Sequence, residues 1–372
     1  MSGNLKTEGK RSQTFVSFNQ AVFVWFKISL LSFGGPAGQI AVMHRLLVEE
    51  LKWVSEKRFL HALNFCMLLP GPEAQQLTIY LGWLLHRVRG GVVAGTLFVL
   101  PGALTVLVLS IIYVTYQQEM LVSSIFFGVK AAVLAIVTTA LWRLARKILR
   151  KKLLVGITIA AFLASFVFAV PFPIVIVGAA LATYFFGEAP VQTAVSDEEG
   201  EGRIIDSWVA AGGSPKPHRA FLVAAICAFL WLAPIAVLYG WLGAGHVYVQ
   251  EAMFFSKMAI VTFGGAYAVL SYMAQQTVGH YGWISAGEML DGLGMAETTP
   301  GPLIMVTQFV GFMGAYHSPG VLDPMMAGCL GALVTTWVTF APCFLWIFLG
   351  APYIELLRGN RVLAAALTGI TA

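Results

Sequence analysis

The stretch FLHALNFCMLLPGPEAQQLTIYLGWLLH, residues 59–86, is apolar over most of its length and is interrupted near its middle by Pro70-Gly71-Pro72. A helix that crosses the bilayer needs about 20 apolar residues, so neither flank of this break is long enough to cross alone. Backbone that is not helical is tolerated at membrane depth only where it is buried in protein or lines a cavity. The stretch therefore predicts two half-helices that meet inside a membrane protein.

Three further apolar stretches are interrupted in the same way, at 15–43 by Gly34-Gly35-Pro36, at 251–275 by Gly264-Gly265 and at 288–316 by Pro300-Gly301-Pro302. Other apolar stretches are long enough to cross the bilayer, at 91–116, 121–142, 219–243 and 325–349, and the stretch at 153–187 is divided into two short spans by Pro171 and Pro173. The sequence therefore predicts an all-α, polytopic membrane protein with broken, re-entrant half-helices.

The composition of the 372 residues supports this class, since 58% are apolar and only 11% are charged, against about 45–50% and about 25% in soluble domains. The mean hydropathy is +0.79. These values exclude an ordinary soluble enzyme, a disordered chain and a secreted disulfide scaffold. They also argue against a nucleic-acid binder, because the net charge of +5 on a membrane protein indicates basic loops.

The sequence contains no catalytic or cofactor motif. The four cysteines form no CxxC pair, the seven histidines form no HExxH or other metal spacing, and there is no Walker A loop or GxSxG elbow. We therefore expect neither an enzyme nor a bound cofactor or metal, and the lack of a Walker A loop argues against an ATP-driven pump. Residues 1–13 are polar and the next apolar stretch has no small-residue cleavage site, so no cleavable signal peptide is expected.

The chain contains an internal repeat with an offset of 230 residues. Residues 27–72 and 257–302 align without a gap and are identical at 13 of 46 positions, where composition alone would give about 3. The aligned pairs include Lys27 with Lys257 and Pro70-Gly71-Pro72 with Pro300-Gly301-Pro302. After an insertion near residues 316–323 the offset becomes 241.

The repeat divides the chain into an N-terminal copy at 1–187, a hydrophilic linker at 188–218 and a C-terminal copy at 219–372. At the second offset Ala372 matches Ala131, which lies inside the 121–142 span. We therefore expect either that the natural protein continues beyond Ala372 or that the C-terminal copy has lost its last span.

The basic residues indicate that the two copies face opposite sides of the membrane. The loop at 44–58 holds four Lys and Arg, whereas its copy at 274–288 holds none, and basic residues collect in cytoplasmic loops. If the four interrupted stretches are re-entrant, 20 of the 23 Lys and Arg lie on the cytoplasmic side, together with the N-terminus and the 188–218 linker. Stretches that crossed fully would put basic clusters outside, so the prediction is two inverted repeats.

Inverted repeats with broken helices are typical of secondary transporters, whose substrate lies between the repeats near the middle of the membrane. A half-helix that begins at this depth points free N–H groups and the positive end of its dipole into the site, which suits an anion. The predicted substrate-binding residues lie at the four breaks and their flanks: Lys27, Gly34, Gly35, Pro70, Gly71, Pro72, Gln75, Gln76, Lys257, Gly264, Gly265, Thr299, Pro300 and Gly301.

Lys27 and Lys257 occupy matching positions shortly before the two Gly-Gly pairs. An intramembrane lysine costs about 2.5–3.5 kcal/mol in insertion measurements, so a matched pair favours neutralisation of a multiply charged anion. The alternatives are snorkelling to the membrane interface and a structural ion pair. Lys130 is a weaker candidate, because its copy is Thr371.

Two carboxylates near the breaks, Glu73 and Glu297, are candidates for proton coupling. Glu73 directly follows the first Pro-Gly-Pro, where the alternative role is to stabilise the dipole of the helix that begins there. Glu297 lies just before the second Pro-Gly-Pro and has pairing with a lysine as its alternative.

The sequence resembles the chromate transporter family in its long, two-repeat form. The motifs that carry the resemblance are FGGPAGQ at 33–39 and LLPGPEAQQ at 68–76, with TFGGAYA at 262–268 and TPGPL at 299–303 in the second copy. The resemblance implies export of chromate across the bacterial inner membrane, driven by the proton-motive force and giving chromate resistance. It also implies sulfate, an isosteric dianion, as a related or competing substrate, and two halves of opposite topology.

Two other functions stay open at this stage. One is a passive oxyanion channel with the same site, and the other is a membrane-embedded anion sensor that uses the linker to bind a partner. The expected partners are the chromate or sulfate oxyanion and the lipid bilayer, without nucleic acid. The sequence fixes neither the transport direction, the coupling ion nor the oligomeric state, and a homodimer is among the open states.

Overall fold

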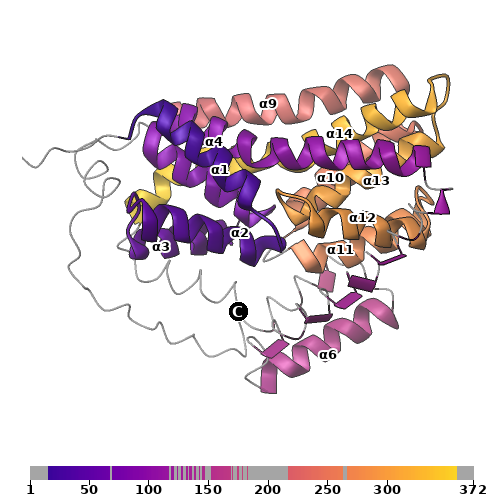
Figure 1. Ribbon diagram of the computed structural model, residues 1–372, viewed down its shortest axis with the longest axis horizontal. Coiled ribbons are helices and arrows are strands. Elements are labelled where there is room, and N and C mark those ends of the chain that lie inside the picture. The colour runs from indigo at the N-terminus through magenta and orange to yellow at the C-terminus, as the bar shows by residue number, and fades with distance from the viewer. Residues whose placement is uncertain are drawn as a thin grey trace, which may run out of the picture.

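The computed structural model describes residues 16–67, 69–116, 119–120, 152–168, 217–262 and 266–357, together with scattered positions between 124 and 182. All regular secondary structure in the described residues is helical, as the periodicity and composition of the sequence predict. Figure 1 shows the long helices α4 (Glu73–Tyr116), α9 (Pro217–Leu242) and α14 (Pro324–Leu357) running along the longest axis of the molecule, with the shorter helices gathered beside them.

The N-terminal copy consists of short helices and one long one: α1 (Phe18–Leu31), α2 (Gly35–His44), the π-helix η1 (Arg45–Glu50), α3 (Glu56–Cys66) and α4. The apolar stretch at 15–43 is therefore broken between α1 and α2, where Gly34 has a φ of 77° and Gly35 a φ of 75°. The stretch at 59–86 is broken between α3 and α4. Both predicted breaks are confirmed.

The C-terminal copy follows α9 and has the same plan: α10 (Val247–Val261), α11 (Ala266–Ala274), the π-helix η2 (Gln275–His280), α12 (Ala286–Thr298), the 3₁₀ turn η3 (Leu303–Met305), α13 (Val306–His317) and α14. The stretch at 288–316 is interrupted between α12 and η3, as predicted. In the stretch at 251–275, α10 ends at Val261 and α11 begins at Ala266, while Gly264 and Gly265 lie outside the described residues.

Several features of the two copies recur at the offsets found in the sequence. The π-helices η1 and η2 are 230 residues apart at both ends, and each is followed by a residue with positive φ, Lys52 at 54° and Gly282 at 64°. Ser55 and Ser285 cap α3 and α12. At the second offset, α4 and α14 end at the matching residues Tyr116 and Leu357. The duplication is therefore visible in the backbone as well as in the sequence.

The chain reverses direction inside α4, at His86 and Arg87, whose φ and ψ angles are not helical. Gly82 before the turn approaches Gly90 after it so closely that a β-carbon on either would clash with the other segment. Gly311 of α13 and Gly331 of α14 make the same close approach. Each copy thus ends its described part in a helical hairpin, one short arm following a Pro-Gly-Pro and one long arm.

Three helices in the described residues are long and apolar enough to cross a membrane: α4, residues 220–242 of α9 and residues 324–351 of α14. They cover the uninterrupted stretches predicted at 91–116, 219–243 and 325–349. The predicted span at 121–142 and most of the stretch at 153–187 lie outside the described residues, apart from α6 (Lys152–Phe166). The fold is a polytopic membrane protein.

The apolar core forms two clusters, one in each copy, and the long helices connect them. Residues 99–114 of α4 contribute to the cluster around α10, α12 and α13, and residues 343–351 of α14 contribute to the cluster around α1 and α3. Each long helix therefore packs partly into the other copy, which brings the two Pro-Gly-Pro loops to the boundary between the copies.

Candidate functional site

The two Pro-Gly-Pro loops each contact the broken helix of the other copy. The N–H of Gly71 donates a hydrogen bond to the carbonyl oxygen of Thr262 at 2.8 Å, and the N–H of Gly301 donates to the carbonyl oxygen of Ser32 at 2.9 Å. Ser32 and Thr262 are the residues that end α1 and α10. The interaction is reciprocal, since donors and acceptors are matched pairs of the repeat, and all four breaks therefore meet at one boundary.

Both loop glycines are required by conformation and by space. Gly71 has a φ of 115° and Gly301 a φ of 101°, values that residues with a β-carbon rarely adopt. A β-carbon at Gly71 would lie 3.1 Å from Sγ of Cys343, and one at Gly301 would lie 3.2 Å from Cα of Gly102. Cys343 and Gly102 are themselves a matched pair, so each loop packs against the long helix of the other copy in the same way.

Two buried glutamines hold the loops from the side. Nε2 of Gln76 donates to the carbonyl oxygen of Pro70 at 2.7 Å, and Nε2 of Gln39 in α2 donates to the carbonyl oxygen of Gly301 at 2.7 Å. Gln76 was expected from the sequence to face the substrate, and the structure places its amide donor on the loop backbone instead. Gln39 was not singled out in the sequence, where its matching position is Val269.

The short helices that begin at the breaks leave their first N–H groups without a side-chain cap at two described positions. Gly34, the N-cap of α2, and Pro302, the N-cap of η3, form no side-chain capping hydrogen bond. The first N–H groups of a helix have no partner within it, and together with the helix dipole they favour an anion. The breaks therefore supply the backbone groups that an anion site needs.

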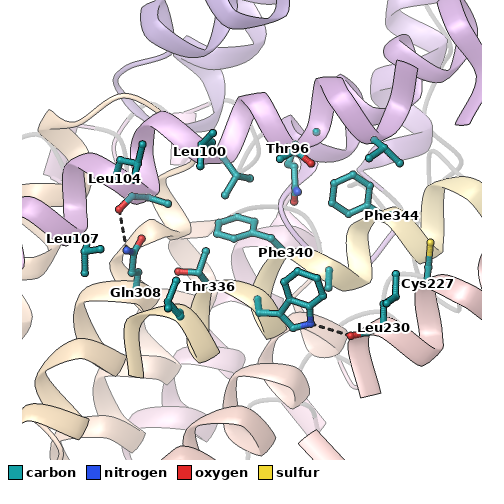
Figure 2. A pocket seen from close by; sticks show the side chains of 18 of the residues that line it. Thr96, Leu100, Leu104, Leu107, Cys227, Leu230, Gln308, Thr336, Phe340 and Phe344 are labelled. Atoms are coloured by element: carbon teal, nitrogen blue, oxygen red, sulfur yellow. Dashed lines mark hydrogen bonds between the residues drawn. The ribbon is translucent and has the colours of Figure 1, made fainter. Parts of the chain in front are cut away.

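A cavity of about 440 Å³ lies beside the loops, between α4, α9, α13 and α14 (Figure 2). Its walls are mostly apolar, with Leu100, Phe340 and Phe344 among the lining residues. Every residue of α14 in the wall follows a wall residue of α4 by 241 positions, for example Thr336 after Gly95 and Phe340 after Val99. The cavity thus lies where the matching faces of the two long helices meet.

Two glutamine amides interrupt this apolar wall. Gln75, in the first turn of α4, is fully buried, and neither its Nε2 nor its Oε1 has a hydrogen-bond partner among the described residues. Gln308 of α13 donates from Nε2 to the carbonyl oxygen of Ala103 at 2.9 Å, an interaction drawn in Figure 2, and its Oε1 has no partner in the described part of the chain. Buried polar atoms nearly always have partners, so these amides mark a place for a polar ligand or water.

The comparison with known proteins agrees with this architecture. The family model described as chromate transporter matches residues 19–184 and 249–372. The chain belongs to the chromate transporter family. It is 32% identical over 362 residues to a chromate transport protein of Pseudomonas aeruginosa, covering 96% of this chain and 78% of that protein.

Two further relatives in the chromate transporter family are of similar distance. A chromate transport protein of Cupriavidus metallidurans is 28% identical over 358 residues, covering 96% of this chain and 79% of that protein. A probable chromate transport protein of Synechococcus elongatus is 28% identical over 358 residues, with coverage of 95% and 81%. No solved structure matches the chain. Membership of this family supports a role in chromate transport, and the names of the relatives indicate a transporter rather than an enzyme.

The two lysines lie on the outer faces of their helices in this member of the chromate transporter family. Lys27 of α1 and Lys257 of α10 are both exposed, and no ion pair joins either to a carboxylate within the described residues. Lys130 lies outside the described positions. The structure therefore brings the loops, Gln75 and Gln308 together but does not enclose the lysines with them.

The predicted carboxylates and Thr299 lie at the ends of the half-helices. Glu73 is the first residue of α4 and is 9% exposed, and Glu297 is buried near the end of α12. Thr299 is buried and ends α12. A third carboxylate, Glu251 of α10, is fully buried and was missed in the sequence, because one glutamate in an apolar stretch without a glycine or proline beside it gives no signal of a site.

Proposed function

We propose that this chain is a secondary active transporter that exports chromate across the bacterial inner membrane, driven by the proton-motive force. Chromate resistance of the cell follows from this activity, and sulfate is a related or competing substrate because it is also a tetrahedral dianion. The membership in the chromate transporter family supports the substrate class. The proposal adds the direction, the energy source and the site.

The observation that carries the proposal is the reciprocal pair of hydrogen bonds between the loops and the opposite broken helices. It brings uncapped half-helix ends from both copies to one boundary, and secondary transporters with repeated halves bind their substrates at such a boundary. The dianion would be bound by backbone N–H groups at these ends and by the amides of Gln75 and Gln308. Lys27 and Lys257, which are exposed, would capture the anion before it reaches the loops.

Alternating access would follow from movement of one copy against the other. The Gly71 and Gly301 hydrogen bonds are made across the boundary, and the apolar cavity beside them provides room for the two long helices to shift. In the proposed topology the two copies are inverted, and the N-terminus, the loop at 44–58 and the 188–218 linker lie in the cytoplasm. Charge supports this orientation, since Arg58 and His61 of α3 match Glu288 and Asp291 of α12.

Flux measurements in proteoliposomes test the proposal. The purified chain is reconstituted, chromate uptake is followed with and without an imposed pH gradient, and sulfate is added as competitor. We expect chromate flux that rises with the pH gradient and falls with sulfate. Flux that follows voltage alone and ignores the pH gradient would identify a passive channel, and chromate binding without any flux would identify a sensor.

A further inference from the structure

Glu251 is a carboxylate that the proposed site does not use. It lies in the second turn of α10, its exposed fraction is 0%, and neither Oε1 nor Oε2 has a hydrogen-bond partner among the described residues. An ionised carboxylate that is buried without a donor or a counter-charge is strongly unfavourable. In the conformation described here the group must therefore carry a proton.

The carboxyl group is enclosed by α13 and by aromatic rings. A β-carbon at Gly314 of α13 would lie 2.7 Å from Oε1 of Glu251 and 3.2 Å from Cβ of Trp283, so the glycine makes the space that the carboxyl group occupies. The ring of Trp283 is stacked on Tyr281 at 4.3 Å and lies edge-on to Phe254 at 5.8 Å. Apolar surroundings of this kind contain no group that would stabilise the charged form.

The ionisable groups of the neighbouring elements are engaged elsewhere or exposed. On α10 itself, the hydroxyl of Tyr248 donates to the carbonyl oxygen of Ala327 at 3.2 Å, and Lys257 is exposed. On α13, His317 lies 3.4 Å from Glu288 of α12 through Nε2 and 2.9 Å from the carbonyl oxygen of Trp283 through Nδ1.

The remaining ionisable groups belong to the other two helices packed on α10. At the start of α14, Asp323 accepts two backbone hydrogen bonds, and Tyr239 of α9 is 53% exposed. None of the ion pairs between described residues includes Glu251. No neighbouring charge therefore accounts for the presence of this carboxyl group.

The duplicated fold does not require a carboxyl group at this position. The position that matches Glu251 is Ala21 of α1, which is buried. The shared close approach of Gly82 to Gly90 and of Gly311 to Gly331 sets the match between α13 and the first arm of α4, and in it Gly314 corresponds to Leu85, which is also buried. An alanine and a leucine thus occupy the positions that a glutamate and a glycine occupy in the C-terminal copy.

We propose that Glu251 binds and releases the proton that couples chromate transport to the pH gradient. This inference rests on the proposed function, since it assigns a residue to the proton-driven step. When α10 and α13 separate, water reaches the carboxyl group, its O–H bond breaks, the proton passes to water and the carboxylate is stabilised by hydration. When the helices close again the carboxylate takes up a proton from water. His317, one turn after Gly314 and partly exposed, lies on the side from which water would enter.

The test is flux in proteoliposomes with wild type, Glu251→Gln and, as matched control, Glu119→Gln at an exposed carboxylate. Glutamine has the shape of the protonated group but cannot release a proton. We expect Glu251→Gln to lose at least 10-fold of the acceleration by an imposed pH gradient, while the control keeps it and chromate binding persists. A Glu251→Gln protein with wild-type acceleration overturns the inference.

Two further observations keep the inference separate from the function and from folding. If wild type shows no chromate flux, the proposed function fails; if wild type shows flux that ignores the pH gradient, the role of Glu251 fails. Should Glu251→Gln not fold, the double variant Glu251→Ala with Gly314→Leu copies the apolar pair of the N-terminal copy and is expected to fold without coupling. In the wild type, the infrared band of a protonated carboxyl group should change when chromate is added, and a band that stays constant contradicts the proposal.

Discussion

At the scale of single residues, Gln75 is the side chain whose chemistry conflicts most clearly with its surroundings. Its amide is buried in an apolar wall with both polar atoms unpartnered in the described residues, and such an amide costs about 1–3 kcal/mol of stability. Residues kept at such a cost are commonly found where function requires them. The matching stretch of the C-terminal copy begins with Leu303 and Ile304, so the fold itself does not need an amide there.

Replacement of Gln75 by leucine should therefore change stability and transport in opposite directions. We expect Gln75→Leu to leave the thermal midpoint in detergent unchanged or raised, because an unsatisfied amide is removed, while chromate flux falls at least 10-fold. Gln76→Leu serves as the contrast, since it removes the 2.7 Å bond to the Pro70 carbonyl and should lower the midpoint. Wild-type flux in Gln75→Leu would remove this residue from the site.

The matched lysines give a second prediction at this scale. Lys27→Ala or Lys257→Ala should abolish the protection of cells against chromate while the protein still reaches the membrane, because the dianion then meets no positive charge on its way to the loops. Lys57→Ala, in the basic loop of the N-terminal copy, is the control and should keep protection. Growth on chromate together with immunoblots of membrane fractions decides the matter; full protection by both alanine variants contradicts a role for the lysines.

At the scale of elements, the Pro-Gly-Pro loops should be more sensitive to a single added methyl group than any exposed helix position. Gly71→Ala and Gly301→Ala each place a β-carbon at strongly positive φ and against the other copy. We expect each to lose about 1–3 kcal/mol and most of the chromate flux. Gly240→Ala in α9, where a β-carbon has no neighbour within 4 Å, should instead be neutral or stabilising by up to about 1 kcal/mol.

Thermal unfolding of the three alanine variants in one detergent provides the measurement. Equal midpoints for Gly71→Ala and Gly240→Ala would show that the loop does not hold the boundary between the copies. The magnitudes at Gly71 and Gly301 should also differ, because Gly71 would press on the side chains of Cys343 and Gln76, which can move, whereas Gly301 would press on the backbone of Gly102.

The sequence predicts the elements better than their contacts. Glycine and proline mark each break because they disrupt helical backbone at fixed positions, so the ends of α1 and α3 and the starts of α2 and α4 follow from composition. The turn at His86 and Arg87 has no such marker. Nor does the contact of Gln39 with Gly301, since these residues lie 262 positions apart and nothing in either local sequence points to the other.

At the scale of the whole molecule, the repeat is the strongest prediction and the one that the structure extends most. The offset found by aligning letters returns in the bounds of the π-helices and in the paired contacts of Gly71 and Gly301. The exchange of long helices between the two core clusters could not be predicted, because it depends on packing between copies. It explains why one chain needs both copies to form a site.

The inverted orientation of the copies is the prediction that belongs to this scale. Trp53 and Trp283 are a matched pair but are buried, so the exposed matched positions Lys57 and Gly287 are better sites for labelling. In a variant without the four native cysteines, Lys57→Cys should react with a membrane-impermeant maleimide only after the cytoplasmic side is opened, and Gly287→Cys should react in intact cells. This follows because the basic loop at 44–58 stays in the cytoplasm while its uncharged copy does not. Labelling of both from the same side would mean that the copies are parallel, and the reciprocal loop contacts would then need a symmetry axis along the membrane normal instead of one in its plane.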